Sequence, residues 1–302
     1  MQSLSNIRSN FTRNESLAKY TNFGCGGVAQ LLFTPENTDD LINFLRSEGR
    51  GQKITIIGGG TNLLVRDGGV DGVVIVTKKL NGIGLVNDNI VAECGVVNSR
   101  LSNFARNLDI GNFEFLGCIP GTVGGACRMN AGCYGSELKD ILVSLDTVDP
   151  DGNVRAFSVD ECALGYRKNG LPKDLIFLRA TFRADIPRDR NESEEIFRKM
   201  LEEKLKTQPI GERTCGCTFK NPSSIPAWKI IKDVDLQGVD LNGAKFSEKH
   251  ANFLINHGNC SSTDLENLIT LAQSRVMDTM GIDLELEVEI IGNPNAAENR
   301  NA

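Results

Sequence analysis

The chain has 302 residues, of which 40% are hydrophobic and 24% are charged, so its composition is that of an ordinary globular protein with enough residues for two or three compact lobes. Its net charge of −6 gives no general attraction to nucleic acids or to acidic membrane surfaces, and we expect neither as a partner. No stretch approaches the apolar length of a membrane span, and residues 1–14 lack the apolar core of a signal peptide.

The nine cysteines are odd in number, and no two of them form a Cys-x-x-Cys pair. A disulfide framework or a zinc site would need paired or closely spaced cysteines. We therefore expect reduced thiols, no metal site and a cytoplasmic protein.

The chain is expected to begin with a flexible N-terminal arm, residues 1–19, which is rich in Ser and Asn. A first lobe, residues 20–80, follows this arm. Apolar residues recur at helical spacing over residues 37–48 and predict a helix there. Short apolar runs predict strands at residues 54–57 and 72–76.

Three consecutive glycines, Gly58, Gly59 and Gly60, follow the first of these strands. Backbone N–H groups that no side chain covers can converge on a phosphate or a pyrophosphate. The run lacks the Gly-Lys-Ser/Thr ending of a nucleotide triphosphatase loop and the Gly-x-Gly-x-x-Gly spacing of a dinucleotide-binding helix. A tight turn that needs positive φ explains the same glycines, so both interpretations stay open.

A second lobe is expected over residues 81–188. It would begin with a strand at 90–96 and a helix that Asn98 or Ser99 caps. The densest glycine region of the chain, residues 117–135, comes next. Two glycine-rich segments in adjoining lobes favour one extended cofactor held between them, although a close-packed turn explains the second segment equally well. The remaining predicted strands of this lobe are residues 142–148, 154–157 and 175–183.

A third unit is expected over residues 189–292. Its predicted helices are residues 192–207, 227–232 and 263–280, and its predicted strands are residues 252–255 and 284–291. In the last strand apolar residues alternate with Glu285, Glu287 and Glu289, which places these glutamates away from the core face. The tail, residues 293–302, is expected to be disordered.

Five segments, in this order and spacing, resemble the UDP-N-acetylenolpyruvoylglucosamine reductase (MurB) family in its shorter type. They are residues 57–65 (IGGGTNLLV), 121–132 (with GTVGG and MNAG), 165–167 (GYR), 217–222 (CTFKNP) and 287–292 (EVEIIG). The resemblance covers about residues 20–292. It implies an α+β fold, in which a two-lobed FAD-binding domain of the vanillyl-alcohol-oxidase (PCMH-like) type precedes a smaller α+β substrate-binding domain.

The resemblance also implies a reaction. In this family NADPH reduces bound FAD, and the reduced flavin transfers hydride to the enolpyruvyl group of UDP-N-acetylenolpyruvoylglucosamine, which gives UDP-N-acetylmuramate for peptidoglycan synthesis. We expect the FAD to be non-covalent, because the two histidines of the chain, His250 and His257, come after the flavin lobes. Because family members of this type are often monomers, a monomer is expected.

Three residues match the catalytic positions of the family. Arg167 would hold the substrate carboxylate, since a guanidinium keeps its charge and can bind both oxygens. Glu287 would polarise that carboxylate or handle a proton. Cys217 would donate the proton, where the best-known members of the family have serine. Without the resemblance, a surface arginine, a solvated glutamate and a buried structural pair, Cys215 and Cys217, explain the same residues.

The remaining site residues are expected to bind the cofactor and the substrate. The expected FAD contacts are Ile57, Gly58, Gly59, Gly60, Thr61, Asn62, Leu63, Gly117, Pro120, Gly121, Thr122, Gly124, Gly125, Asn130, Ala131, Gly132 and Arg213. The expected UDP-sugar contacts are Tyr166, Lys220, Asn221 and Lys229. The two lysines would supply local positive charge for the diphosphate, and ordinary surface lysines are the alternative.

Two other classes of function stay open. A flavin-dependent oxidase of the same fold would share the glycine-rich segments but would not need the sugar reduction. A catalytically silent nucleotide-sugar binding module would be colourless and indifferent to NADPH.

Overall fold

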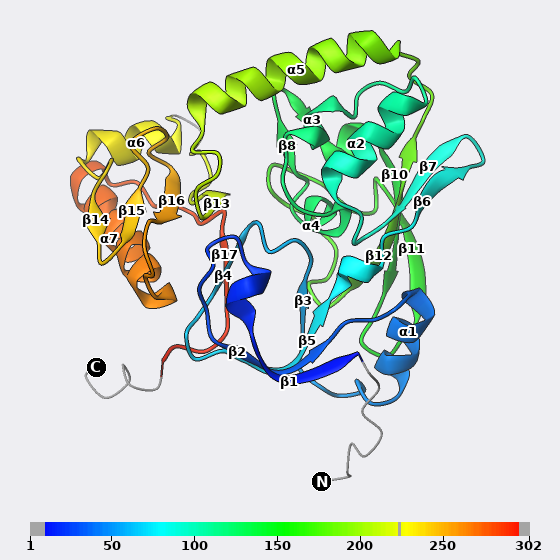
Figure 1. Cartoon of the computed structure of the whole chain (residues 1–302), viewed down its shortest axis with the longest axis horizontal. Coiled ribbons are helices and arrows are strands. Elements are labelled where there is room, and N and C mark those ends of the chain that lie inside the picture. Colours follow the sequence, from blue (N-terminus) through cyan, green and yellow to red (C-terminus); the bar gives the residue numbers. More distant parts are fainter. Residues whose placement is uncertain (1–9, 223–224, 296–302) are drawn as a thin grey trace. The chain divides into compact units, whose positions relative to one another are not determined.

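The computed structural model describes residues 10–222 and 225–295 (Figure 1). The first nine residues of the predicted arm and the predicted disordered tail from residue 296 onward lie outside the described residues. The chain divides into two compact units. Unit 1 is Met1–Thr12, Leu31–Gly59 and Gly72–Glu203, and unit 2 is Arg13–Gln30, Gly60–Asp71 and Lys204–Ala302.

Unit 1 contains most of the helices and strands of the first two predicted lobes. The helices are α1 (Thr38–Arg46), η2 (Thr77–Lys79), α2 (Asn98–Asn107), α3 (Glu114–Gly117), α4 (Val123–Arg128), η3 (Leu138–Asp140) and α5 (Arg190–Thr207), the last residues of which belong to unit 2. The strands are β3 (Ile54–Ile57), β6 (Ile83–Val86), β7 (Asn89–Glu93), β8 (Gly132–Cys133), β9 (Ser136–Glu137), β10 (Leu142–Val148), β11 (Val154–Ser158) and β12 (Ile176–Arg183), while β1 (Phe11–Ser16), β2 (Val28–Phe33) and β5 (Val70–Val76) each contain a unit boundary.

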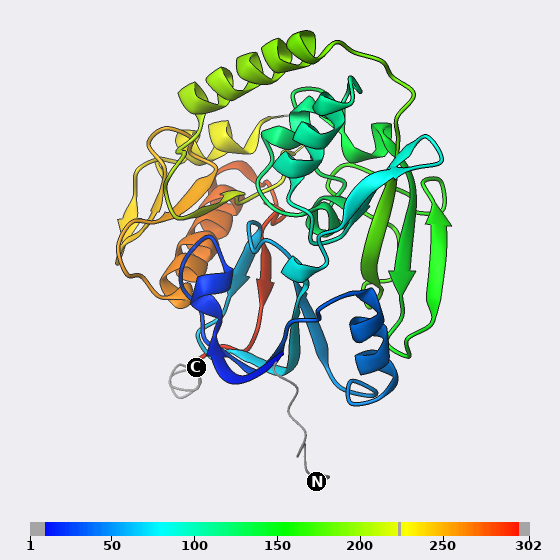
Figure 2. The ribbon, with the colours of Figure 1, turned by 45° about the vertical axis from the view of Figure 1, so that its right-hand side comes forward.

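Two larger sheets contain these strands except β8 and β9, which pair with each other. One has the order β1-β2-β5-β3, and the other has the order β11-β10-β12-β7-β6, whose neighbouring strands are visible in Figure 2. The pairs of the second sheet are antiparallel, whereas β3 pairs with β5 in parallel. The observed strands confirm the predictions for residues 54–57, 142–148 and 154–157.

The helix predicted over residues 37–48 is α1, which ends at Arg46. Asn37 caps it by accepting a hydrogen bond from the Asp40 N–H at 2.9 Å, and its apolar face is buried in the core of unit 1. The predicted cap of α2 was wrong. Val97 is its N-cap residue, and no side chain caps it. Asn98 is buried, and its side-chain amide donates instead to the Ile119 carbonyl at 3.2 Å.

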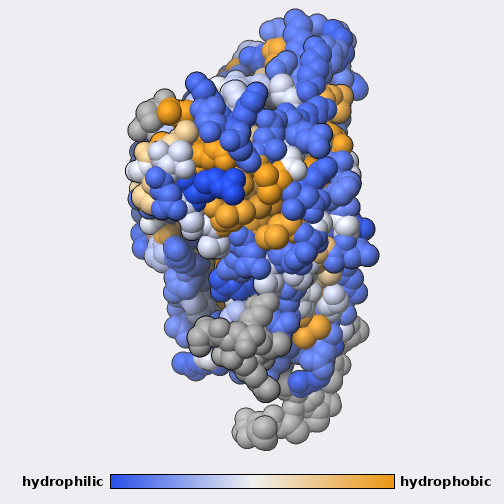
Figure 3. Space-filling view, turned by 90° about the vertical axis from the view of Figure 1, so that its left-hand side faces the viewer, coloured by the Kyte–Doolittle hydropathy of each residue, from blue (hydrophilic) through white to orange (hydrophobic). Residues whose placement is uncertain are grey.

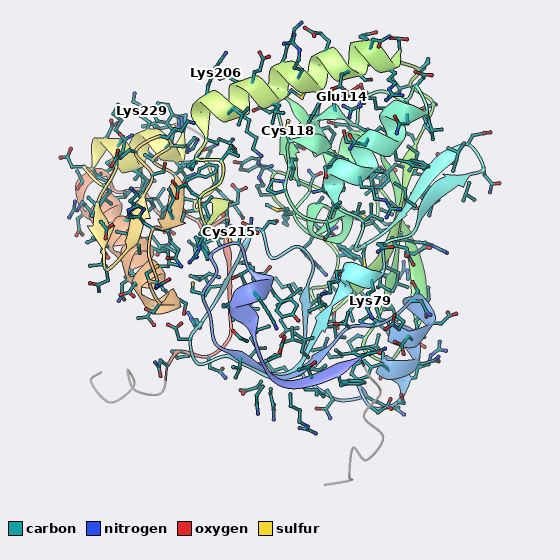
Figure 4. The ribbon with its side chains drawn as sticks, viewed as in Figure 1. Lys79, Glu114, Cys118, Lys206, Cys215 and Lys229 are labelled. Carbon is teal, nitrogen blue, oxygen red and sulfur yellow. The ribbon has the colours of Figure 1, made fainter. Side chains whose placement is uncertain are left out.

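A buried carboxylate attaches the start of α5 to α3. Glu114, labelled in Figure 4, is 5% exposed. It accepts hydrogen bonds from Arg188 at 2.9 Å and from the Ser193 hydroxyl at 2.8 Å. A buried charge is stable only with such partners. The bonds of Glu114 to Arg188 and Ser193 therefore hold the start of α5 in place.

Unit 2 has its own core. Its helices are η1 (Leu17–Tyr20), α6 (Ala227–Asp233) and α7 (Ser262–Met280), and its strands are β4 (Leu63–Val65), β13 (Thr214–Cys217), β14 (Asp240–Leu241), β15 (Ala244–Phe246), β16 (Phe253–Asn256) and β17 (Glu289–Ile291). One sheet has the order β13-β16-β15-β14, and β17 pairs with β4. The apolar face of α7 packs into this core.

The two units do not follow the contiguous lobes that we expected. Residues 13–30 and 60–71 belong to unit 2 together with the C-terminal part of the chain. The Arg66 N–H donates to the Ile291 carbonyl at 2.9 Å, and the Asn256 amide donates to the Phe23 carbonyl at 2.8 Å. These hydrogen bonds join segments that are distant in sequence, and periodicity does not reveal them.

Two further expectations need correction. Residues 11–20 form β1 and η1, and Leu17 is fully buried, so this part of the chain is not a flexible arm. The last predicted strand, 284–291, is regular only over β17, because that is the part that pairs in parallel with β4.

The surface is mainly hydrophilic on the face that Figure 3 shows, with hydrophobic side chains gathered in one area. Within the described residues, no helix combines the length and the apolar composition that crossing a membrane requires.

We predict that Asp67→Ala destabilises the protein. The Asp67 carboxylate accepts from the Ser262 and Thr263 N–H groups, each at 3.1 Å, at the first turn of α7. Loss of such a cap should lower the free energy of unfolding by about 1 to 2 kcal/mol. Urea denaturation measures this change. The control Asp174→Ala removes an exposed carboxylate, and equal stability of the two variants would contradict the capping role.

Candidate functional site

In unit 1 the two glycine-rich segments touch. A Cβ atom on Gly58 would lie 2.6 Å from the Thr122 Oγ1 atom, and one on Gly59 would lie 2.8 Å from the Gly121 Cα atom. A side chain on Gly59 would overlap backbone, so glycine is required there, whereas a side chain on Gly58 would displace the Thr122 hydroxyl. The two glycine-rich segments, which the sequence predicted to share one cofactor, thus lie against each other at Gly58 and Gly59.

Thr122 has a buried hydroxyl beside this contact. It is 4% exposed, and its Oγ1 atom has no hydrogen-bond partner among residues 10–222 and 225–295. A buried polar group without a partner costs about 1 to 3 kcal/mol, so a bound molecule or a water that hydrogen-bonds it would stabilise the site. The N–H groups of Val123 and Gly124 already donate to the Val96 and Cys94 carbonyls, each at 2.8 Å. The Thr122 hydroxyl is thus a buried polar group of this loop that the described residues leave without a partner.

Gly60 has a different environment. It lies in unit 2 with φ +61, and a Cβ atom there would overlap the Tyr20 carbonyl oxygen. Its own carbonyl accepts from the Asn22 N–H at 3.0 Å. The tight-turn interpretation therefore holds for this glycine, while Gly58 and Gly59 shape the contact with the second glycine-rich segment.

The other residues expected to bind FAD in unit 1 differ in exposure. Packing explains why residue 117 is glycine, because a Cβ atom there would lie 2.7 Å from the Phe197 ring. Gly124 packs against Cys94, 3.0 Å from where its Cβ would be. Ile57 and Ala131 are buried, whereas Pro120 and Gly125 are exposed.

Asn130 is fully buried and holds the loop that carries Arg167. Its Nδ2 atom donates to Glu137 and to the Gly165 carbonyl, each at 3.0 Å. Its Oδ1 atom accepts from the Lys139 N–H at 3.0 Å. The described hydrogen bonds of this side chain thus go to protein groups, which supports a structural role rather than the cofactor contact that we expected.

Arg167 sits at the tip of a tight loop. Gly165 and Lys168 exchange two backbone hydrogen bonds, of 3.0 and 3.1 Å, around Tyr166 and Arg167. Arg167 has φ +52, a conformation that is uncommon for side-chain-bearing residues and clusters at functional sites. Its Nη2 atom donates to the Gly132 carbonyl at 3.0 Å, and its guanidinium carbon lies 5.2 Å from the centroid of the exposed Tyr166 ring.

Glu137, which the sequence did not single out, lies beside this loop. A hydrogen bond from Lys139 lowers its pKa most, and Asn130 and the charge of Arg167 lower it further, against the effect of burial. The carboxylate therefore stays ionised and balances the positive charges around it. A lone glutamate after Tyr134-Gly135-Ser136 carries no signal of this role in the sequence.

In unit 2, both cysteines of the Cys-Gly-Cys motif lie in β13, but they differ in exposure. Cys215, labelled in Figure 4, is 4% exposed, and its thiol contacts the Leu63 carbonyl at 3.3 Å. Burial raises the pKa of Cys215 to about 12. Cys217 is half-buried. Residues two apart share a face in a regular strand, but Gly216 has φ +81 and the ladder with β16 is irregular here, so the two thiols differ in exposure.

Glu287 lies next to the segment that carries Cys217. The N–H group of Glu287 donates at 2.9 Å to the carbonyl of Thr218, the residue after Cys217. Asn62 donates from its side chain to the Glu287 carbonyl at 2.8 Å. Unit 2 therefore brings Cys217, Glu287 and the residues that follow the glycine turn together, while Arg167 belongs to unit 1.

Two of the residues expected to bind the UDP-sugar, Lys220 and Asn221, have partners within the protein. Lys220 forms an ion pair with Glu285. The Asn221 side chain accepts from the Ala227 N–H at 2.9 Å at the start of α6. Lys229 is exposed on α6 (Figure 4). The exposed Arg213, expected to bind FAD, donates to the Gly258 carbonyl at 3.3 Å.

All nine cysteines are free. Within the described ranges, no group of three or more His, Cys, Asp and Glu side chains could hold a metal ion.

Of the residues expected to bind FAD after the glycine turn, Thr61 is half-buried and Leu63 is buried.

We predict that iodoacetamide modifies Cys217 and leaves Cys215 unmodified when the native protein is treated at about pH 8. At this pH the buried thiol of Cys215 stays protonated because its pKa is raised to about 12. Both cysteines lie in the tryptic peptide of residues 214–220, so fragmentation mass spectrometry distinguishes them. Denatured protein, in which both thiols react, is the control. Equal labelling in the native protein would contradict the assignment.

Two family models match parts of the chain. A family described as FAD binding domain matches residues 29–158, and one described as UDP-N-acetylenolpyruvoylglucosamine reductase, C-terminal domain, matches residues 208–291. The UDP-N-acetylenolpyruvoylglucosamine reductase of Rickettsia akari is 39% identical over 293 residues, which are 96% of this chain and 98% of the relative. That of Rickettsia typhi is 39% identical over 290 residues, 95% of this chain and 97% of the relative.

A solved structure extends the similarity to the fold. The crystal structure of UDP-N-acetylenolpyruvylglucosamine reductase (MurB) from Thermus caldophilus superposes with a TM-score of 0.81 and 29% identity, and the match covers 94% of this chain and 99% of that one. The predicted α+β class, an FAD-binding domain followed by a smaller C-terminal domain, is confirmed. The chain belongs to the UDP-N-acetylenolpyruvoylglucosamine reductase family.

Proposed function

We propose that this protein reduces UDP-N-acetylenolpyruvoylglucosamine to UDP-N-acetylmuramate, with FAD as its cofactor and NADPH as the reductant. The observation that carries this proposal is the 39% identity to a reductase of that name over 96% of the chain. The reaction is a step of peptidoglycan precursor synthesis. We also propose a cytoplasmic protein that binds neither nucleic acid nor membranes, as its composition and charge predicted, and a monomer, as its resemblance to the family implied.

The residues of unit 1 fit a non-covalently bound FAD. Close backbone contact at Gly58 and Gly59 leaves no side chain between this turn and the Gly121-Thr122 segment, and the buried Thr122 hydroxyl offers a hydrogen bond to a phosphate oxygen. When bound, FAD supplies the hydride, taken from NADPH, that adds to the enolpyruvyl double bond. Both histidines, His250 and His257, lie in unit 2, which favours a cofactor without a histidine link.

Arg167 is proposed to bind the substrate carboxylate. Hydride addition leaves negative charge on the neighbouring carbon and its carboxylate, and a cation at that point stabilises the charge. A guanidinium has five N–H donors, and one of its nitrogens bonds the Gly132 carbonyl, which orients the group. The exposed Tyr166 beside it is proposed to bind the same part of the substrate.

Cys217 is proposed to donate the proton that completes the reduction. A thiol has an ordinary pKa of about 8.5 and gives up its proton more readily than the alcohol of serine. Cys215 is less suited to this role, since burial in the core raises the pKa of its thiol to about 12 and makes it a weaker acid. Of the two cysteines that flank Gly216, Cys217 is the more exposed and is therefore the one proposed as the proton donor.

Glu287 is proposed to polarise the substrate carboxylate or to handle a proton, and Lys220, Asn221 and Lys229 to bind the UDP moiety. Lys220 would exchange its partner Glu285 for a phosphate oxygen. Arg213 and Thr61 are also proposed to contact FAD.

We predict two separable half-reactions. Purified protein should be yellow, NADPH without air should bleach its flavin absorbance, and UDP-N-acetylenolpyruvoylglucosamine should restore the colour. Stopped-flow absorbance measures both steps. A colourless protein would favour the silent binding module, and bleaching that oxygen but not the sugar reverses would favour an oxidase.

Substitution of the proposed proton donor should separate the same steps. Cys217→Ser keeps a dissociable proton and should retain measurable turnover. Cys217→Ala should keep flavin reduction by NADPH but slow sugar reduction by about 100-fold or more, the range that general acids contribute. Cys215→Ala is the matched control for the loss of a thiol, with folding checked by circular dichroism. Unchanged turnover of Cys217→Ala would rule out this donor.

A further inference from the structure

We infer that Asn62 is a positioning residue for Glu287, and that its side-chain amide fixes the direction in which this glutamate leaves the backbone. The inference rests on the proposed function, in which Glu287 acts on the substrate. It assigns to the end of the glycine turn a role in the carbon chemistry in addition to, or in place of, the cofactor contact expected from the sequence.

Asn62 holds the C-terminal segment through two hydrogen bonds. Its Nδ2 atom donates to the Glu287 carbonyl at 2.8 Å. Its own carbonyl accepts from the Glu289 N–H at 3.0 Å. The parallel pairing of β4 and β17 begins directly afterwards, with Glu289 opposite Leu63. Asn62 is therefore the point at which the two strands are brought together.

The other side of Glu287 is held by Thr218. The N–H groups of Glu287 and Val288 donate to the Thr218 carbonyl at 2.9 and 3.3 Å. Thr218 is buried, and it is fixed in turn, since its N–H donates to the Asn252 carbonyl at 2.7 Å and its hydroxyl accepts from the Leu254 N–H at 3.2 Å.

Both peptide groups that flank the Glu287 Cα atom are thus restrained. With the N–H group and the carbonyl fixed, the backbone dihedrals of Glu287 have little freedom, and the Cα–Cβ direction is set. The carbonyl of Glu287 lies before β17, which begins at Glu289. The regular ladder does not supply its donor, and the Asn62 amide does. A catalytic group must be held in this way, because a displacement of about 1 Å can slow a reaction by about 100-fold.

The position of Asn62 depends on the glycine turn. Gly60 is pressed against the Tyr20 carbonyl at φ +61, where a Cβ atom would not fit. The chain then reaches Asn62 after one residue. The same turn that begins with the contact at Gly58 and Gly59 therefore also determines where the Asn62 amide points.

The test uses Asn62→Ala, which removes the amide, and Asn62→Asp, which keeps its size but replaces the donor with oxygen. In the FAD-loaded protein we expect reoxidation by UDP-N-acetylenolpyruvoylglucosamine to slow by about 10- to 100-fold, while flavin reduction by NADPH changes by less than about twofold. The sugar KM should change less than the reoxidation rate. Single-turnover stopped-flow absorbance resolves these steps.

A double-mutant cycle shows whether Asn62 acts through Glu287. If it does, Asn62→Ala should slow reoxidation little further in a Glu287→Gln background. Independent roles would instead multiply the two effects. Asn256→Ala is the matched control, since Asn256 also donates from its side chain to a backbone carbonyl of unit 2 at 2.8 Å, that of Phe23. Its loss should lower stability without selectively slowing reoxidation.

The outcomes separate this inference from the proposed function. Wild-type protein that the sugar cannot reoxidise overturns the proposed function. If the wild type reacts and Asn62→Ala reacts equally fast, or slows both half-reactions alike, or combines multiplicatively with Glu287→Gln, the positioning role is overturned. If Asn62→Ala does not fold or bind flavin, the rates of Asn62→Asp test the positioning role instead. If neither variant folds, Asn62 serves stability alone, and the inference is overturned.

Discussion

Close backbone contact at three consecutive glycines is the constraint on which the site depends. Gly58 and Gly59 lie against Gly121 and Thr122 in unit 1, and Gly60 lies against the Tyr20 carbonyl in unit 2. A side chain on Gly59 or Gly60 would overlap backbone atoms, and one on Gly58 would displace the Thr122 hydroxyl. The turn therefore does two tasks in succession, since it first forms the proposed phosphate contact and then directs the chain to Asn62.

Asparagine side chains, that of the fully buried Asn130 and that of the half-buried Asn62, hold the proposed catalytic residues where regular secondary structure does not. Asn130 binds the Gly165 carbonyl and supports the loop of Arg167, and Asn62 binds the Glu287 carbonyl just before β17. A carbonyl outside a helix or a ladder still needs a donor. A side-chain amide supplies one and at the same time fixes the residue, which suits groups whose orientation determines the rate.

The cysteine pair illustrates how one glycine decides reactivity. Gly216 interrupts β13, so Cys215 enters the core with a pKa raised to about 12 while Cys217 stays half-buried. The same residue types, two positions apart, thus have different chemistry. In the proposed mechanism, the more exposed Cys217 takes the place of the serine found in the best-known members of the family, while Cys215 stays buried.

The sequence by itself determined the local elements and the motifs. Helical spacing of apolar residues predicted α1 and α7, and the glycine segments and the Tyr-Arg and Cys-Thr-Phe-Lys-Asn-Pro motifs identified the family, because these features depend on residues close in the chain. Only the tertiary structure decided the rest. Asn62 meets Glu287 across 225 residues, Lys220 pairs with Glu285, and residues 60–71 join the C-terminal unit. Periodicity carries no information about such long-range hydrogen bonds and ion pairs, so the roles of these residues depend on how the chain folds back on itself.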